Sequence, residues 1–273
     1  MKRIIILLAG ITMAFTSQAQ DSTQAEKTDT IKIGNMIIIK KPGAKDENSS
    51  VDRKYRRTHY KPTNVSTSWF LFDIGVSQFR DETNYANAIA NGYLPAGANE
   101  DWFNLRNGKS INFNLWVLMQ RVNLIKHVVN LKYGAGIELN NYRYTETIKF
   151  QEGKTPLVVN ENTLYKKNKL AADYITVPVM LNFNFTPQRK NGFGFSAGVS
   201  AGYLYSARQK IVTEAEGKKK YREGFDLRDW KISYIGELNL GPIKFYGSYA
   251  NKSMFKNSLD QTPYTVGFRW SNW

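Results

Sequence analysis

The sequence predicts an all-β fold: an eight-stranded antiparallel up-and-down transmembrane β-barrel with a mostly extended N-terminal periplasmic leader. Eight segments alternate apolar and polar residues with a period of two, which is the period of a β-strand. Short and long connections alternate between these segments, as turns and loops do in a membrane barrel. The last segment has an aromatic face and an edge without a partner, and pairing with the first segment would close the sheet.

Residues 1–19 are predicted to be a signal peptide that is cleaved on export. Lys2 and Arg3 form a basic start, and residues 4–14 form an apolar run that is too short to cross a bilayer. Ser17-Gln18-Ala19 is a cleavage site of the small-x-small type. The alternative is a short membrane anchor, which the length of the apolar run disfavours.

Residues 20–67 are predicted to form a separate periplasmic leader. Two short apolar segments flank Gly34-Asn35, which indicates a tight hairpin, and a polar linker follows. The basic run at residues 53–61 is interpreted as a solvated tether, and contact with anionic lipid headgroups is the alternative. Residues 68–273 make up the predicted barrel of the outer membrane.

The predicted strands share one apolar face and one face of glycine, serine, asparagine and charged residues. They cover residues 68–79, 110–124, 128–144, 173–185, 193–208, 228–240, 243–252 and 264–273. The long connections cover residues 80–109, 147–172, 213–227 and 256–261. An even number of strands leaves both termini in the periplasm, where the leader is expected.

Charged residues of both signs occur on the polar faces. The interior of an eight-stranded barrel is just wide enough to be filled by side chains, so charges buried there must pair. We therefore expect a salt-bridge network in the lumen rather than an open pore, with about half of these charges at the wet barrel ends. The predicted network consists of Asp73, Lys132, Glu138, Lys231, Glu237, Lys244 and Arg269.

The apolar faces are expected to contact lipid, with aromatic girdles near the strand ends. In the closing strand this face consists of Tyr264, Val266, Phe268 and Trp270. Trp273 has the opposite parity, so either the strand ends at Trp270 or a bulge restores the register. Pro178 cannot donate a ladder bond, which predicts a bulge or break there. Arg121 has lipid-facing parity near a periplasmic end, where it would snorkel.

Two strand segments are similar to those of a known family. Ala172-Asp173-Tyr174-Ile175-Thr176-Val177-Pro178-Val179-Met180-Leu181 resembles the Tyr-x-x-x-Pro strand of the PorT-like outer-membrane β-barrel proteins of Bacteroidetes-type bacteria. Residues 134–144 resemble another strand of that family, and Ile31-Lys32-Ile33-Gly34-Asn35 resembles a leader found before such barrels. The resemblance covers most of the chain and implies a barrel in a Gram-negative outer membrane. The name-giving member is implicated in protein secretion, a role that these strand patterns do not by themselves assign.

Catalytic and metal-binding residues are scarce. The chain has no cysteine, which excludes disulfides, cysteine-bound zinc, thiol nucleophiles and a lipoprotein anchor. Of its two histidines, His59 lies in the leader and His127 at a predicted periplasmic turn. A hydrolase of the outer leaflet would need a histidine beside a serine at the outer rim. We therefore expect no enzyme, no cofactor and no metal.

The long loops carry two features that suit binding. Basic residues occur at Lys166, Lys167, Lys218, Lys219 and Lys220. Solvated loop charge is the default interpretation, and attraction to the phosphates of lipopolysaccharide is the functional one. The loop at residues 80–109 contains Tyr85, Tyr93, Trp102 and Phe103, which would form either a binding surface or a cap over the barrel mouth.

The sequence thus predicts a monomeric, non-enzymatic outer-membrane barrel with a structural or adhesive role, or a role as accessory to an envelope or secretion assembly. A narrow channel for ions or small solutes is the alternative, and an outer-leaflet lipid-modifying enzyme is a further one. The expected partners are outer-membrane lipids and lipopolysaccharide, the barrel-insertion machinery, and an envelope protein bound through the leader or the loop at residues 80–109. Nucleic acid is not expected, because an exported chain rarely meets it.

Overall fold

The computed structural model describes residues 29–33, 36–40, 61–151, 153–161, 163–189 and 191–271. The chain divides into two compact units, Met1–Arg57 and Thr58–Trp273. In the first unit, β1 (Asp29–Ile33) and β2 (Met36–Lys40) pair as an antiparallel hairpin. The predicted signal peptide, most of the predicted linker and Trp273 lie outside the described residues.

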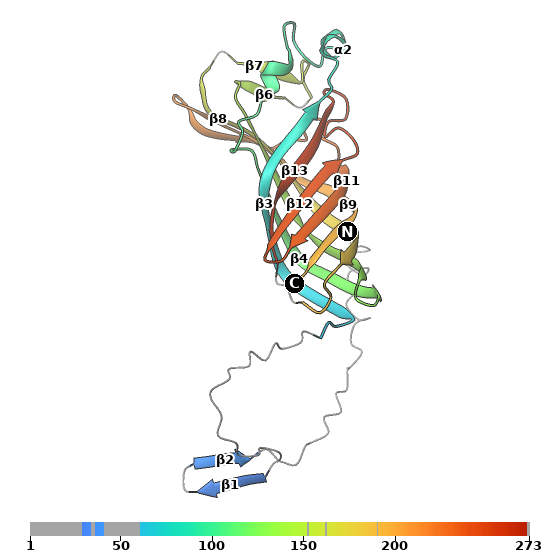
Figure 1. Ribbon diagram of the computed structural model, residues 1–273. Coiled ribbons are helices and arrows are strands. Elements are labelled where there is room, and N and C mark those ends of the chain that lie inside the picture. Colours follow the sequence, from blue (N-terminus) through green and yellow to red (C-terminus); the bar gives the residue numbers. More distant parts are fainter. Residues whose placement is uncertain are drawn as a thin grey trace, which may run out of the picture. The chain divides into compact units, whose positions relative to one another are not determined.

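Eight long antiparallel strands of the second unit close into a ring (Figure 1). They are β3 (Val65–Asp81), β4 (Ile111–Ile125), β5 (Val129–Tyr144), β8 (Tyr165–Asn184), β9 (Phe193–Thr213), β11 (Trp230–Leu240), β12 (Ile243–Ala250) and β13 (Gln261–Trp270). Each strand pairs with the next along the chain, and β13 returns to pair with β3. The predicted eight-stranded up-and-down barrel is therefore confirmed.

The closing seam pairs β13 with β3 along the whole length of β13, from Gln261 opposite Asp81 to Trp270 opposite Phe72. Gly267 and Gly75 lie directly opposite each other on the inner face of this seam. A Cβ atom on Gly75 would lie 2.6 Å from the hydroxyl oxygen of Tyr246. The two glycines therefore make room for the tyrosine ring inside the barrel.

Two irregularities change which residues face inward near the start of β3 and the end of β4. Phe70 has a φ of 54°, and Trp69 and Phe70 are both exposed as a result. The pairing of β4 with β5 slips by one residue at Val117, which is a β-bulge. Met119, which shares the parity of the lipid-facing residues of its strand, is consequently buried inside the barrel.

The same bulge corrects the prediction for Arg121. This residue lies directly opposite Lys132, which is buried in the lumen, and residues directly opposite in neighbouring strands share a face. Its predicted lipid-facing parity is wrong, because the bulge turns it inward. At Pro178 the predicted break is present: the pairing of β5 with β8 skips Pro178 and Val177.

The two ends of the barrel differ in their connections. At one end, which we call the turn end, β4 and β5 are joined by a tight turn in which Lys126 and His127 have positive φ. The other end, which we call the loop end, carries the long connections and the secondary structure within them (Figure 1). These elements are α2 (Tyr85–Ala90), the 3-10 helix η2 (Glu100–Phe103), β6 (Ile148–Phe150), β7 (Val158–Asn160) and β10 (Gly217–Tyr221).

Three strands are longer than predicted, and one of them is β3, which covers Val65–Asp81 rather than residues 68–79. β8 begins at Tyr165, within the predicted loop at residues 147–172, and β9 continues to Thr213. Their loop-end parts pair with each other, and β10 adds to the edge of β9. No helix in the described part of the chain is long and apolar enough to cross a membrane.

An aromatic core fills the loop end and closes the mouth of the barrel. Phe103, Phe150, Phe225 and Phe255 come from four different connections, and all are at least 97 % buried. They pack against inward-facing residues of the strands such as Tyr144. Burial of one such aromatic side chain contributes about 1.5–3 kcal/mol. The long loops are therefore held as a cap, and Phe103, Tyr85 and Trp102 belong to it.

Replacement of Phe255 by alanine is expected to loosen the cap without opening the strand ring. The ring of Phe255 stacks on that of Phe150 at 5.8 Å between centroids, and a phenylalanine-to-alanine cavity costs about 3–5 kcal/mol. Limited proteolysis of the folded protein in detergent should cut the loops faster, while heat-modifiable migration on gels is retained. Leu164→Ala, at a residue 88 % exposed, is the matched control. Loss of heat-modifiable migration in the Phe255 variant would contradict this separation.

Candidate functional site

The centre of the lumen is organised around Asp73, which is completely buried. Arg269 of the closing strand binds both of its oxygens: Nε donates to Oδ1 at 2.6 Å and Nη2 to Oδ2 at 2.7 Å. The indole N–H of Trp116 donates to Oδ2 at 2.7 Å, and the side-chain amide of Asn114 does so at 3.1 Å. A buried carboxylate is tolerated when it is paired and hydrogen-bonded in this way, and the arrangement joins β13, β3 and β4.

The same arginine continues the network toward the opposite wall. Arg269 forms an ion pair with Glu237 of β11, and Glu237 forms a second ion pair with Lys132 of β5. The hydroxyl of Ser196 also donates to Glu237, at 3.4 Å. Asp73, Arg269, Glu237 and Lys132 therefore form a chain of alternating charge that crosses the lumen and connects four strands.

A second buried pair joins Lys231 of β11 to Glu138 of β5. Glu138 also accepts hydrogen bonds from the hydroxyl of Thr176 at 3.3 Å and from the side-chain amide of Asn140 at 3.2 Å. The ammonium group of Lys231 lies 4.8 Å from the centre of the Tyr174 ring. Glu138 thus has partners on two other strands, β8 and β11, besides its own.

The structure brings six of the seven predicted lumen residues into ion pairs. The seventh, Lys244, donates to the carbonyl of Ser271 at 3.0 Å and to its hydroxyl at 2.5 Å, at the turn end. All seven are buried, and even the most exposed, Lys231, is only 8 % exposed. The expectation that half would sit at wet ends is therefore wrong. Each of the six ion-paired residues finds its partner on a neighbouring or facing strand, because an eight-stranded barrel is narrow enough for side chains to meet across it.

The network is completed by polar contacts that were not predicted from the sequence. Trp116 binds the carboxylate of Asp73, and the hydroxyl of Tyr246 donates to the side-chain oxygen of Asn112. The parity of Trp116, which it shares with Asn112 and Asn114, is the signal that would have placed it inside. Beside Trp116 and Tyr246 the lumen retains a cavity of about 30 Å³, which has room for about two water molecules.

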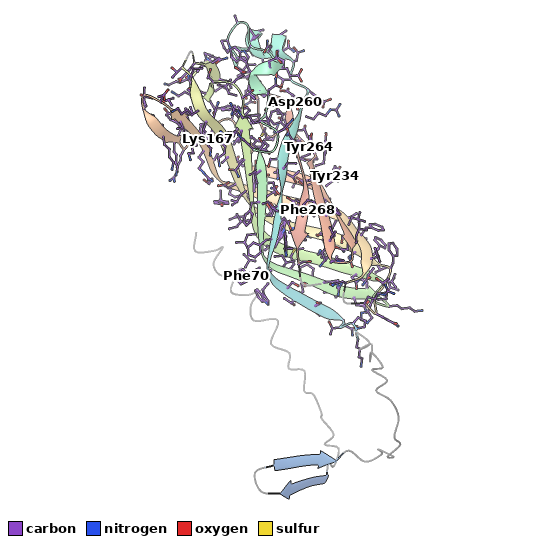
Figure 2. All side chains as sticks on the ribbon, turned by 60° about the vertical axis from the view of Figure 1, so that its left-hand side comes forward. Phe70, Lys167, Tyr234, Asp260, Tyr264 and Phe268 are labelled. Atoms are coloured by element: carbon purple, nitrogen blue, oxygen red, sulfur yellow. The ribbon has the colours of Figure 1, made fainter. Side chains whose placement is uncertain are left out.

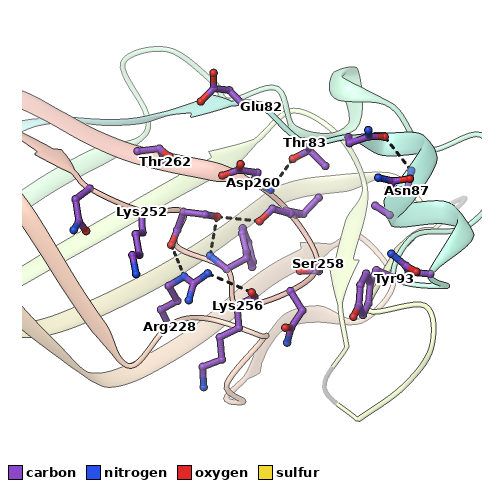
Figure 3. A pocket seen from close by; sticks show the side chains of 18 residues that line it. Glu82, Thr83, Asn87, Tyr93, Arg228, Lys252, Lys256, Ser258, Asp260 and Thr262 are labelled. Atoms are coloured by element: carbon purple, nitrogen blue, oxygen red, sulfur yellow. Dashed lines mark hydrogen bonds between the residues drawn. The ribbon is translucent and has the colours of Figure 1, made fainter.

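A polar cleft of about 570 Å³ opens at the loop end (Figure 3). One wall is α2, whose N-terminus is capped by the side chain of Asn84, and the other is the connection between β12 and β13. Arg228 braces that connection by donating to the carbonyls of Ser253 at 3.0 Å and Lys256 at 3.3 Å. The size of the cleft suits a small ligand, and its lining contains side-chain amides and charged groups of both signs.

Tyr85 anchors α2 to the barrel beside this cleft. Its hydroxyl donates to the carboxylate of Asp81 at 2.8 Å. Desolvation by burial, together with the charge of Asp81, raises the pKa of Tyr85 above its ordinary value. The phenol therefore stays neutral at physiological pH and acts as a hydrogen-bond donor that holds the helix in place.

The predicted basic loop residues are divided between different environments. Lys166 pairs with Glu214 at 2.8 Å, and Lys219 pairs with Glu216 at 2.6 Å. All five lie on strands rather than in loops: Lys166 and Lys167 on β8, and Lys218, Lys219 and Lys220 on β10. His127 lies at the turn end, and His59 is outside the described residues. In the described ranges no group of three or more histidine, cysteine or acidic residues is arranged to hold a metal ion.

The outer wall of the barrel is apolar (Figure 2). On β8 the outward residues Ile175, Val177, Val179 and Leu181 are 44–52 % exposed, and on β13 Val266, Phe268 and Trp270 are more than half exposed. Aromatic residues stand at both ends of this wall, with Trp69 and Trp270 toward the turn end and Trp230 and Tyr234 toward the loop end. An apolar band bounded by aromatic side chains is the signature of a barrel in lipid.

A comparison with protein families supports the interpretation of this apolar wall as the lipid-facing surface of a membrane barrel. Residues 73–255 match the family model of the outer membrane protein beta-barrel domain, which is more than half of the 273-residue chain. The chain belongs to this family. The matched region begins at Asp73 in β3 and ends at Phe255 in the cap, so it contains most of the ring and assigns the barrel to an outer membrane. A comparison with curated proteins finds no match.

Replacement of Asp73 by alanine is expected to destabilise this outer-membrane barrel by about 3–5 kcal/mol, because Arg269 is left with a buried charge that has lost its main partner. The double variant Asp73→Ala, Arg269→Ala should lose less than the sum of the two single variants, since the residues are directly coupled. The measurement is the urea midpoint of unfolding in detergent micelles. Glu214→Gln, which breaks an exposed pair, should cost less than about 1 kcal/mol. Strict additivity of the two lumen variants would contradict the coupling.

Proposed function

We propose that this protein is a monomeric, non-enzymatic outer-membrane barrel that holds a folded cap at the cell surface, with a structural or adhesive role or a role as accessory to an envelope assembly. The observation that carries the proposal is the filled lumen. The charge chain from Asp73 to Lys132 crosses the barrel, and the cavity beside it has a volume of only about 30 Å³. A barrel whose lumen is filled in this way serves as a membrane anchor for the cap and the leader.

The filled lumen disfavours the channel alternative for an energetic reason. A permeating ion would have to displace buried ion pairs such as Arg269–Glu237 and Lys231–Glu138, and each broken pair leaves an uncompensated charge at a cost of about 3–5 kcal/mol. Above the network, the aromatic core of the cap covers the mouth. Both barriers lie on the same path through the barrel.

In this proposal the loop end faces outside the cell and the turn end faces the periplasm. Long loops on one side and tight turns on the other support this orientation. Residues 1–19 are removed on export, and residues 20–64 remain in the periplasm as a leader, because the first barrel strand begins at Val65 rather than at the predicted residue 68. The PorT-like strand at residues 172–181 supports an accessory role in an envelope or secretion assembly, in which the leader or the turn end contacts the partner.

The purified protein is expected to give no steady single-channel current in planar bilayers, because buried ion pairs block the lumen. Flotation of the protein with vesicles confirms insertion in the same preparation. Steady currents from inserted protein, at several salt concentrations and voltages, would contradict the proposal and favour the channel. Incubation with lipopolysaccharide should leave the mass of that lipid unchanged, and a mass change would favour the lipid-modifying enzyme.

Photo-crosslinking in intact cells separates the adhesive role from the accessory role. A crosslinkable amino acid at Asn87 reports on the cleft at the loop end, and one at Gln188 reports on the turn between β8 and β9 at the turn end. Adducts from Gln188 support an accessory role in the periplasm, and adducts from Asn87 support adhesion. If neither position gives an adduct, both partner-binding roles are wrong.

A further inference from the structure

A three-stranded extension projects from the barrel at the loop end (Figure 1). Residues 165–172 of β8 pair with residues 207–213 of β9, and β10 pairs with residues 209–213 of β9 on its other side. We call this extension the wing. The end of β5 also pairs with it, so that four strands contribute to one surface.

Basic residues align across the wing in a continuous row. Arg143 of β5 lies opposite Lys169 of β8, Lys169 lies opposite Lys210 of β9, and Lys210 lies opposite Lys220 of β10. Directly opposite residues share one face of a sheet, with Cβ atoms about 4.5–5.5 Å apart. The four side chains therefore start from one face and carry charges of the same sign.

Three more basic residues flank this row on the same face. Lys167 and Lys218 both lie opposite Val212, which is two residues from Lys210, and Arg208 is two residues away in the other direction. Desolvation, together with the charges of Lys167, Lys218 and Lys220, lowers the pKa of Lys210. The basic face of the wing consists of Arg143, Lys167, Lys169, Arg208, Lys210, Lys218 and Lys220.

The basic face points away from the barrel axis. The residues of alternate parity, such as Leu170 and Ile211, are buried on the other side of the wing, where Leu170 belongs to the aromatic core of the cap. Lys169 has the same parity as Ile175, which lies on the lipid-facing wall of the same strand. The basic face therefore continues the outer wall, and Figure 2 shows Lys167 at its far end.

Carboxylates of the chain neutralise little of this charge. Asp173 pairs with Arg208, while Glu214 and Glu216 pair with Lys166 and Lys219. Within the described ranges no carboxylate forms an ion pair with the five lysines of the basic face. Like charges placed directly opposite in a sheet destabilise it, so anions bound from outside the chain would stabilise this face.

The position of the basic face indicates which anions lie close to it. Tyr203 and Trp230 pack edge to face with ring centres 5.1 Å apart, as part of the aromatic girdle at the loop end. Along β9, Arg208 follows the exposed Tyr205 after three residues, and along β8, Lys169 is six residues beyond Ile175. Six residues rise about 20 Å along a strand, or about 15 Å in height at the tilt of a membrane barrel. The basic face thus begins at the level of the lipid headgroups.

We propose that the basic face of the wing binds phosphate-bearing headgroups of the lipids that surround the loop end, with Lys169 and Lys210 at its centre. Several ammonium groups on one flat sheet face suit a headgroup that carries more than one phosphate. The wing then lies against the surface of the leaflet and fixes the rotation of the barrel relative to its lipid neighbours. This lipid contact is independent of whether the lumen conducts.

The test compares lipid binding by full-length variants in neutral detergent, measured by native mass spectrometry with a bis-phosphorylated glycolipid. Lys169→Gln, Lys210→Gln is expected to bind on the order of tenfold less glycolipid, and raising the salt concentration should weaken binding by the wild-type protein. Lys169→Arg, Lys210→Arg should retain binding, because the charge is kept. The matched control is Lys166→Gln, Lys219→Gln, which removes the same charge from residues of the wing that pair with glutamates.

Three results would overturn the proposal. Equal loss in the Lys169/Lys210 and Lys166/Lys219 variants would mean that overall charge, not the basic face, determines binding. Unchanged binding in the Lys169→Gln, Lys210→Gln variant with native heat-modifiable migration would mean that the lipid binds elsewhere. Displacement of the glycolipid by inorganic phosphate at equal concentration would mean that the face takes phosphate from any source rather than a lipid headgroup.

Discussion

The ion pair between Asp73 and Arg269 is the contact on which the closed barrel depends. The two residues lie directly opposite each other in the seam between the first and last strands, and their bidentate contact is buried in the lumen. A slip of one residue would move every side chain of β13 to the other face. Arg269 would then enter lipid and Asp73 would lose its partner. The pair thus helps to specify the register of the closing seam, whose two strands lie at opposite ends of the barrel sequence and are joined by no turn.

Around this pair, the barrel divides into regions with different physical character. The middle of the lumen is a paired network of charges, and the loop end is an aromatic core built from four connections. The network connects facing walls through charge, while the core holds the long connections through apolar burial. A rigid, filled barrel with an ordered cap can present a cleft and a wing in fixed positions, which a barrel with loose loops could not do.

Departures from the predicted pattern trace to pairing between strands. The alternation of apolar and polar residues predicted that Met119 and Arg121 face lipid. That prediction would hold for a strand without a bulge. The bulge at Val117 reverses parity from that point on, so both residues turn inward. The wing escaped prediction for a related reason: the alternation of residues 165–172 is masked by a run of lysines and asparagine, and the segment becomes a strand by pairing with β9 and with the end of β5. The basic row across the wing exists only in that register.

The sequence by itself determined the strand number, the alternation of turns and loops, and which charges lie on the polar faces, because a period of two is a local property that each strand carries alone. It also identified Pro178 as a break, since a missing N–H is a property of one residue. Only the tertiary structure decided which charges pair, how deeply they are buried and where parity reverses. Partners such as Asp73 and Arg269 are 196 residues apart in sequence, and a register between distant strands is determined by the whole ring rather than by either strand.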